Sequence, residues 1–514
     1  MSEEKTAGKK MLLIAAFMAG ATLLSKFLGL IRNSMIAAYF GTGMAADAYM
    51  TAQKLPTTLF DIVIGGVISA SFIPVFTGLL DNRKREDAIE FANKFVTLIF
   101  VITSLISVFG IIFASPLISF MAPDYDAERH ALAVQLTSIM FPMIIFTGFA
   151  FSFVGILQSF GEYNIPAIIS LISNVAIIVY FLIFGKKFGV VGLAVTMLVA
   201  WSLQVAVQIP SLKKFKYCYR PNFRFKDENI KAVMLLAGPM LISTWVQPLY
   251  TIVNSRLASS VEGAYSSLEY ANQLYLIATG VVSFVVTNLV FPKLSHANAR
   301  EDKTEAIGLV NMSLKAMMIV IFPLMTGIIL LSVPITSIIY EHGEFTEDRV
   351  QVVAAALSCY AVGMFGLSVN EVFSKAFFSM KNSRIPMITS IISMLADIVA
   401  AYILFKLIGV RGLALAAALG SIINALLNAV CLKRKVKSVF GAADLGTLVK
   451  TLFASVCMGA AVYFIYKYTA VYASGMIGNI ITAGISAVCG VVIYAALIWI
   501  LRVKEIRMIL KKEG

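Results

Sequence analysis

Charged residues are scarce in this chain: they make up 14% of its 514 residues, whereas hydrophobic residues make up 59%. A soluble globular domain carries about 25% charged residues, because its surface must be solvated. Instead, apolar runs of at least about 18 residues recur along nearly the whole length, and each can cross a hydrocarbon core as a helix. The composition excludes a soluble globular protein and predicts an all-α integral membrane protein.

Residues that carry catalysis or hold metals are also few and scattered. The three histidines (His130, His296 and His342) lie far apart, and the five cysteines form no Cys-x-x-Cys pair. The sequence contains no HExxH, no Walker A glycine loop and no GxSxG motif. We therefore predict no enzyme activity, no catalytic residue, no metal site and no cofactor. Any energy for transport must come from a gradient or from the substrate, and Na⁺ and H⁺ stay open as coupling ions.

The hydropathy pattern indicates about fourteen transmembrane helices. A window of about 19 residues places them at residues 11–38, 47–79, 93–120, 131–158, 164–184, 188–211, 229–257, 268–291, 305–334, 349–378, 385–405, 411–432, 448–468 and 476–501.

The net charge of +14 is distributed over alternate loops. A nucleic-acid-binding protein gathers its lysines and arginines on one compact domain, so no nucleic acid partner is expected. With the N-terminus in the cytoplasm, the inner loops hold most basic residues, and the outer loops hold the acidic clusters around Asp124 and Glu341. This pattern follows the positive-inside rule and predicts a multi-pass protein with both termini in the cytoplasm.

An internal repeat supports this topology. At an offset of 220 residues the matches include Ile165-Pro166 with Ile385-Pro386, Ser173 with Ser393, Gly189-Val190 with Gly409-Val410 and Gly192-Leu193-Ala194 with Gly412-Leu413-Ala414. Six spans separate the copies, so the two halves have the same orientation and a pseudo-two-fold axis along the membrane normal. We predict two six-helix lobes, a basic cytoplasmic linker, and two extra C-terminal helices with a basic tail. Their residues are 1–212 and 229–432 for the lobes, 213–228 for the linker and 433–514 for the last part.

Five charged residues lie inside the first two spans: Lys26, Arg32, Asp47, Lys54 and Asp61. A charge at bilayer depth costs at least about 2.5–3.5 kcal/mol, so it normally faces a bundle interior or a wet cavity. The last three are spaced seven apart and form one stripe along a helix. Pro56 on the same helix lacks an N–H and is expected to kink it. We predict a cavity wall or gate; the alternative is a ladder of ion pairs that only holds helices together.

The first span also predicts an anion site. Ser25 and Arg32 share one helix face, and Lys26 lies about 120° away from Arg32. Two cations suit a phosphate or diphosphate. In the seventh and eighth spans, four polar side chains are candidates for contacts with a sugar or peptide headgroup, although ordinary interhelical hydrogen bonds explain each one equally well. They are Gln247, Asn254, Asn272 and Gln273.

Three segments of the N-terminal region, LSKFLGLIRN, FGTGMAADAYMTAQKLP and SFIPVF, carry a family resemblance. They resemble the amino-terminal signature of the MurJ (MviN) lipid II flippases, within the superfamily of multidrug, oligosaccharidyl-lipid and polysaccharide exporters. A second segment, YEHGEFTEDRV at residues 340–350, resembles the outer-loop motif of that family. The similarity covers essentially the whole chain.

The resemblance implies a flippase of the bacterial cell membrane that moves the undecaprenyl-diphosphate-linked peptidoglycan precursor from the inner to the outer leaflet. It implies alternating access without ATP, and partners among membrane lipids and the cell-wall synthesis machinery. It also implies that the last two spans line a groove for the lipid tail. The family's cavity residues correspond to Ser25, Lys26, Arg32 and Asp47.

The sequence departs from the family where Asn33 replaces an aspartate and where Phe60 and Gln273 replace arginines. Our hypothesis is that Lys54 compensates, so that Lys26, Arg32 and Lys54 bind the diphosphate while Ser25, Asp47, Pro56 and Asp61 line the cavity or gate. Four alternatives remain: a flippase for another lipid-linked glycan, a cation-coupled drug exporter, a non-transporting scaffold and a membrane-embedded glycan transferase. The last would need a catalytic constellation that the sequence lacks.

Overall fold

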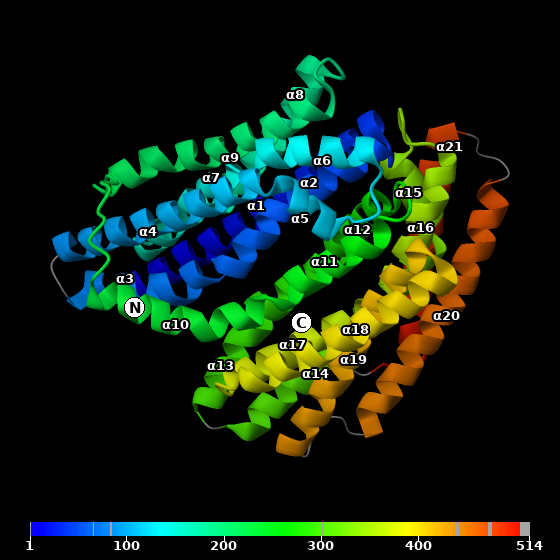
Figure 1. The fold of residues 1–514 in the computed structure, drawn as a ribbon. Coiled ribbons are helices and arrows are strands. Elements are labelled where there is room, and N and C mark those ends of the chain that lie inside the picture. Colours follow the sequence, from blue (N-terminus) through cyan, green and yellow to red (C-terminus); the bar gives the residue numbers. More distant parts are fainter. Residues whose placement is uncertain are drawn as a thin grey trace. The chain divides into compact units, whose positions relative to one another are not determined.

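The computed structural model describes residues 2–64, 66–82, 85–300, 302–436, 442–470 and 475–503. Within these ranges it contains twenty-one α-helices and two π-helices and no strand, which confirms the all-α prediction (Figure 1). The chain divides into two compact units, Met1–Ser266 and Ser267–Gly514. The first unit thus includes residues 229–266, which the repeat assigns to the second lobe; the repeat-based lobes remain a prediction.

The first unit contains eleven of the α-helices and one π-helix among its described residues. They are α1 (Ser2–Phe40), α2 (Met44–Val63), η1 (Ile68–Phe72), α3 (Ile73–Asn82), α4 (Arg85–Ile112), α5 (Ala114–Met121), α6 (Ala127–Met140), α7 (Met143–Ser159), α8 (Asn164–Phe184), α9 (Gly189–Lys214), α10 (Glu228–Thr244) and α11 (Val246–Ala258). Helix α12 (Ala264–Val285) begins in this unit and continues in the second.

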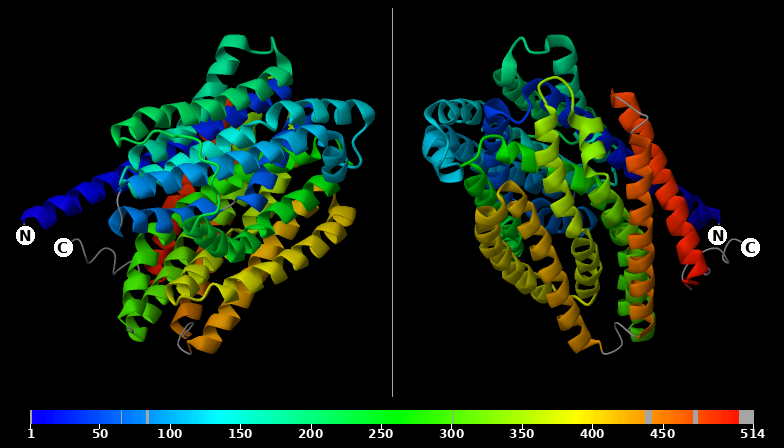
Figure 2. Two further views of the ribbon diagram at one scale, coloured as in Figure 1. Left: turned by 60° about the vertical axis from the view of Figure 1, so that its left-hand side comes forward. Right: turned by 90° about the vertical axis from the view of Figure 1, so that its right-hand side faces the viewer.

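The second unit continues from α12 to the C-terminal helices. Its further elements are η2 (Val286–Val290), α13 (Phe291–Ala299), α14 (Lys303–Leu330), α15 (Ser332–Tyr340), α16 (Glu347–Val362), α17 (Met364–Ser379), α18 (Arg384–Ile408), α19 (Val410–Lys435), α20 (Ala442–Ala470) and α21 (Gly475–Ile500). The last two helices, orange and red in Figure 2, lie side by side.

Nine helices of the described chain are long and apolar enough to cross a membrane, and α16 with α17, which meet at a 40° bend, make a tenth. These nine match nine of the predicted spans. The other five predicted spans carry intramembrane charges, a break or a bend, and they are residues 11–38, 47–79, 229–257, 268–291 and 349–378. The chain is a multi-span membrane protein, and the count of about fourteen spans stays a prediction.

The matched residues of the repeat lie in two helical hairpins, α8–α9 and α18–α19, and the structure explains why several of them are glycines. Helices α8 and α18 both end at a glycine with positive φ, and the turn glycines Gly189 and Gly409 have φ of +54° and +67°. A Cβ at Gly192 would overlap Phe188, and a Cβ at Gly412 would overlap the backbone carbonyl of Leu404. The matched glycines therefore allow each chain reversal and the close approach that follows it.

We expect Gly412→Ala to destabilise the protein by about 1–3 kcal/mol, because the backbone atoms of Leu404 cannot move aside for a methyl group. The matched control is Gly308→Ala on α14, where an added Cβ meets nothing within 4 Å. Alanine there should be neutral or stabilising by up to about 1 kcal/mol. Thermal unfolding of the purified protein in detergent measures both changes. Equal melting temperatures for the two variants would contradict this account.

The two π-helices occupy corresponding positions, 218 residues apart, in α2–η1–α3 and α12–η2–α13. Each lies shortly before a proline, Pro74 or Pro292. Proline lacks an N–H and its ring crowds the carbonyl four residues earlier, so a widened turn relieves the clash. In η1 the N–H of Ile73 donates to the carbonyl of Ile68, five residues earlier. Helix α2 itself continues through the buried Pro56 and ends only at Val63.

The predicted linker, residues 213–228, is held against α4. The hydroxyl of Tyr217 donates to Asn93 Oδ1 at 3.0 Å, and Lys94 Nζ lies 2.8 Å from Asp227 Oδ2. Burial acts to raise the pKa of the Asp227 carboxyl, but the hydrogen bond and charge of Lys94 outweigh it, and the pKa lies below its usual value. The pair therefore stabilises the fold at neutral pH and loses this contribution only in acid.

Candidate functional site

Arg32 is held at the seam between α1 and α8. Its Nε and Nη2 donate to Asn33 Oδ1 at 3.1 and 3.0 Å, and its Nη1 donates to Asn174 Oδ1 at 2.9 Å. The side chain is half-buried. Asn33 thus orients the guanidinium with a neutral amide oxygen.

Asn174 of α8 also contacts the second polar residue of α1. Its Nδ2 donates to the backbone carbonyl of Ser25 at 3.0 Å, and Ser25 Oγ donates to Ser170 Oγ at 3.0 Å. Ser25 and Arg32 thus share a face of α1, as their spacing requires. Two helices therefore build one polar seam along a segment that is otherwise apolar.

Lys26 on α1 and Lys54 on α2 are both half-buried. The three charged residues of the α2 stripe differ in exposure. Asp47 is 1% exposed, Lys54 is half-buried and Asp61 is exposed. The stripe therefore runs from a buried end to an open end. The diphosphate contacts of Lys26, Arg32 and Lys54 remain a prediction.

Asp47, in the first turn of α2, caps the start of α12. Its Oδ2 accepts from the Gly263 N–H at 2.7 Å and its Oδ1 accepts from the Ser266 N–H at 2.9 Å. These donors belong to the N-terminus of α12, where backbone N–H groups have no partner within the helix and carry partial positive charge. Asp47 therefore acts as an N-cap supplied by a distant helix.

Arg129 of α6 completes this cluster and was missed by the sequence analysis. It is 6% exposed, its Nη1 lies 3.8 Å from Asp47 Oδ2, and its guanidinium carbon lies 4.8 Å from the Tyr125 ring centroid. Asp126 and Glu262 lie 3.5 and 3.9 Å from its Nη2. Arg129 Nε and Nη1 have no hydrogen-bond acceptor among the described residues. One indirect signal for this cluster was present, the acidic loop that precedes α6.

The predicted headgroup residues are spread over the two units. Asn254 is buried on α11 in the first unit, and its Oδ1 has no hydrogen-bond donor among the described residues. Asn272 and Gln273 are half-buried on α12 in the second unit. The side chain of Gln247 lies outside the described residues. Their role toward a headgroup stays a prediction.

Two other observations bear on the chemistry of the site. Phe60, at a position where the family pattern has arginine, is 6% exposed and stacks on Phe151 with ring centroids 5.9 Å apart. It is a core residue.

Asp397 is a buried acid that the sequence analysis also missed. It lies on α18 against Gly420 of α19, and its Oδ1 has no partner among the described residues. A buried carboxylate in a membrane span is expensive and marks a candidate functional residue.

No three histidine, cysteine, aspartate or glutamate side chains of the described part of the chain cluster as metal ligands. The polar groups that the structure brings together are instead suited to binding and orienting charge.

We expect Asp47→Ala to lower stability by about 3–5 kcal/mol, because it leaves Arg129 buried without this partner and uncaps α12. Asp47→Asn keeps an acceptor oxygen and should cost less. Asp61→Ala is the matched control on the same stripe: its side chain is exposed and interacts with Lys54, and an exposed ion pair contributes only about 0–1 kcal/mol. Thermal unfolding in detergent measures all three variants. A loss for Asp61→Ala as large as for Asp47→Ala would contradict the assignment.

Comparison with known proteins gives a consistent result. The model of the family described as "Lipid II flippase MurJ" matches residues 36–482. The "Probable lipid II flippase MurJ" of Rhizobium meliloti is 29% identical over 423 residues, 80% of this chain and 78% of that protein. The match begins after Arg32, so Asp47 and Lys54 lie inside it and Ser25, Lys26 and Arg32 precede it.

Two solved structures resemble the fold. "Lipid II flippase MurJ, inward closed conformation" has a TM-score of 0.80 at 25% identity, covering 94% of this chain and 98% of that one. An inward-facing multidrug resistance MATE family transporter of the MOP superfamily has a TM-score of 0.69 at 14% identity, covering 83% of this chain and 98% of that one. The second likeness is one of fold alone.

Proposed function

Because the chain belongs to the MurJ lipid II flippase family, we propose that it moves lipid II from the inner to the outer leaflet of a bacterial cell membrane. The family is one of multi-pass membrane transporters, so the prediction that the chain is not an enzyme is confirmed.

The observation that carries the proposal is the placement of Arg32. Arginine stays protonated at any physiological pH, and its planar fork matches the oxygens of a phosphate. Here the fork is oriented by Asn33 and Asn174 within a segment apolar enough to lie in the membrane. Lys26 and Lys54, both half-buried on the first two helices, supply further positive charge for a diphosphate.

The membrane potential gives the direction of transport. A diphosphate of about two negative charges that leaves a negative-inside cell gains roughly 4.6 kcal/mol per 100 mV, from about 2.3 per charge. Outward movement of the charged headgroup therefore needs no ATP. The distribution of basic loops supports a topology with both termini in the cytoplasm, by the positive-inside rule.

For gating, we propose that the contact of Asp47 with the start of α12 closes one state and opens in the other. An N-cap supplied by a different helix can be broken without unfolding either helix, because water can replace the carboxylate. Ser25, Pro56 and Asp61 would border the path that this opening exposes.

The extra helices α20 and α21 are proposed to hold the lipid tail. They pack on α14 through an apolar cluster that includes Met458 and Ile498, and Tyr494 donates to the carbonyl of Ile319 at 2.8 Å. Their outward residues are apolar and exposed, among them Val456 and Val488. Such a surface suits a long hydrocarbon chain. Contact with the cell-wall synthesis machinery, which would consume the cargo, is part of the same proposal.

The test is complementation of a bacterium depleted of its own lipid II flippase. The wild-type chain should restore growth, and Arg32→Ala should abolish it while the protein still inserts at normal levels, because the cargo loses its oriented cation. Arg32→Lys should retain part of the activity, since it keeps the charge without the fork. Arg300→Ala, at an exposed arginine, is the control.

Normal growth with Arg32→Ala would refute the assigned role of Arg32. Failure of the wild-type chain to restore growth, together with transport of another lipid-linked glycan in vesicles, would favour that alternative cargo. The likeness to multidrug transporters, being one of fold alone, carries no argument about cargo.

A further inference from the structure

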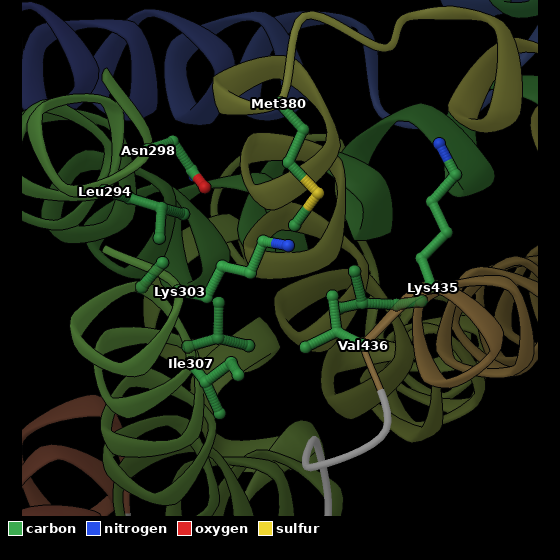
Figure 3. Close-up of a pocket in the computed structure, with 10 residues that line it drawn as sticks. Leu294, Asn298, Lys303, Ile307, Met380, Lys435 and Val436 are labelled. Carbon is green, nitrogen blue, oxygen red and sulfur yellow. The ribbon is translucent and has the colours of Figure 1, made fainter. Parts of the chain in front are cut away.

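The second unit contains a cavity of about 420 Å³ at a place where the ends of four helices meet. It lies between the C-terminal part of α13, the start of α14, the end of α17 and the end of α19 (Figure 3). Its size is within the range of about 300–1,000 Å³ that small-molecule sites occupy. All its lining residues belong to this one unit, and none of them is a residue of the polar seam around Arg32.

The lining combines two cations with apolar walls. Lys303 and Lys435 come from opposite sides, while Leu294, Ile307 and Leu432 form the surface between them. In Figure 3 the Lys303 nitrogen points into the cavity, and the Lys435 nitrogen lies at its edge. The described lining residues include no carboxylate. A ligand that fits this surface has a negative head and an apolar body.

Asn298 adds one neutral polar group to the lining. Its Nδ2 donates to Ser379 Oγ at 2.8 Å, which fixes the amide and leaves Oδ1 toward the cavity (Figure 3). An amide oxygen accepts hydrogen bonds and does not bind anions. It therefore suits a hydroxyl group carried by the same ligand.

The position of the cavity along the helices indicates that such a ligand would come from the membrane. Lys303 is the first residue of α14 and Lys435 is the last residue of α19, and both helices are candidate spans. The cavity thus lies where apolar spans meet water, which is the level of the lipid head groups. Its apolar side, with Ile307 and Val310, continues into the span.

We propose that this cavity binds one anionic phospholipid, with the phosphate between Lys303 and Lys435 and the glycerol region against Leu294, Ile307 and Leu432. Inorganic phosphate would use the lysines but not the apolar lining, which a phospholipid buries. Asp302 does not line the cavity, and its Oδ1 accepts from the Glu305 N–H as the cap of α14.

The test is native mass spectrometry of the full-length protein titrated with phosphatidylglycerol or phosphatidylcholine. We expect one tight phosphatidylglycerol site. The double variant Lys303→Ala/Lys435→Ala should weaken it by about 25-fold, from about fivefold per lysine near an anionic lipid. The matched control Lys293→Ala/Lys433→Ala removes the same charge from exposed positions on α13 and α19 that do not line the cavity, and it should bind normally. Ile307→Trp, which fills the cavity without a change of charge, should also block binding.

Three results would overturn the proposal. Equal losses in the two double variants would mean that only the general surface charge matters. Binding of phosphatidylcholine as tight as that of phosphatidylglycerol would remove the role of the two lysines. Displacement of the lipid by inorganic phosphate at the same concentration would mean that the apolar walls contribute nothing. The variants' elution as folded monodisperse protein keeps each comparison valid.

Discussion

A charged or strongly polar group inside a membrane needs a partner, and in this protein the partner usually comes from another helix. Arg32 of α1 is oriented by Asn174 of α8, and the same asparagine contacts Ser25. Asp47 of α2 is satisfied by the N-terminus of α12 and by Arg129 of α6. These contacts join helices that apolar packing alone would leave free to slide. They also concentrate the polar chemistry in a few places, which is what a carrier of a charged headgroup requires.

The helices divide by task. In the part of the chain that the structure describes, nine helices are long and apolar enough to cross a membrane, and they form the framework of the two units. The five remaining predicted spans hold the charged stripe of α2 with Lys26 and Arg32, the π-helices before Pro74 and Pro292, or the bend between α16 and α17, whereas the buried Asp397 lies on one of the nine. Irregular backbone in a membrane is tolerated where protein or water satisfies its polar groups. Residues that must change partners during transport are therefore expected on these helices, while the regular ones keep their contacts.

Much of the fold could be predicted from the sequence, because hydropathy reports membrane spans directly and the glycine matches of the repeat reflect turns that only glycine allows. The common face of Ser25 and Arg32 followed from helix geometry. The pairing of Asp47 with Arg129 did not, since the two are far apart in sequence and neither periodicity nor charge pattern links them. Asp397 was passed over because it is a single acid in a long apolar span. The π-helices were missed because a proline predicts a distortion without specifying its form.

The functional site could be predicted from the sequence less completely than the fold, for a physical reason. Cation positions can be read from helix spacing, but a binding site depends on which side chains of different helices meet. Phe60 illustrates this: the resemblance implies an arginine at this position, whereas the structure has a buried aromatic ring that stacks on Phe151.

The most direct test of the central claim is the rate at which the purified protein moves lipid II across vesicle membranes as a function of the imposed potential. If the headgroup crosses with its diphosphate charged and held by cations, the rate of movement out of the negative compartment should increase with the potential, and a monophosphate-linked analogue should respond less steeply. A rate that does not depend on the potential for either lipid would contradict the account.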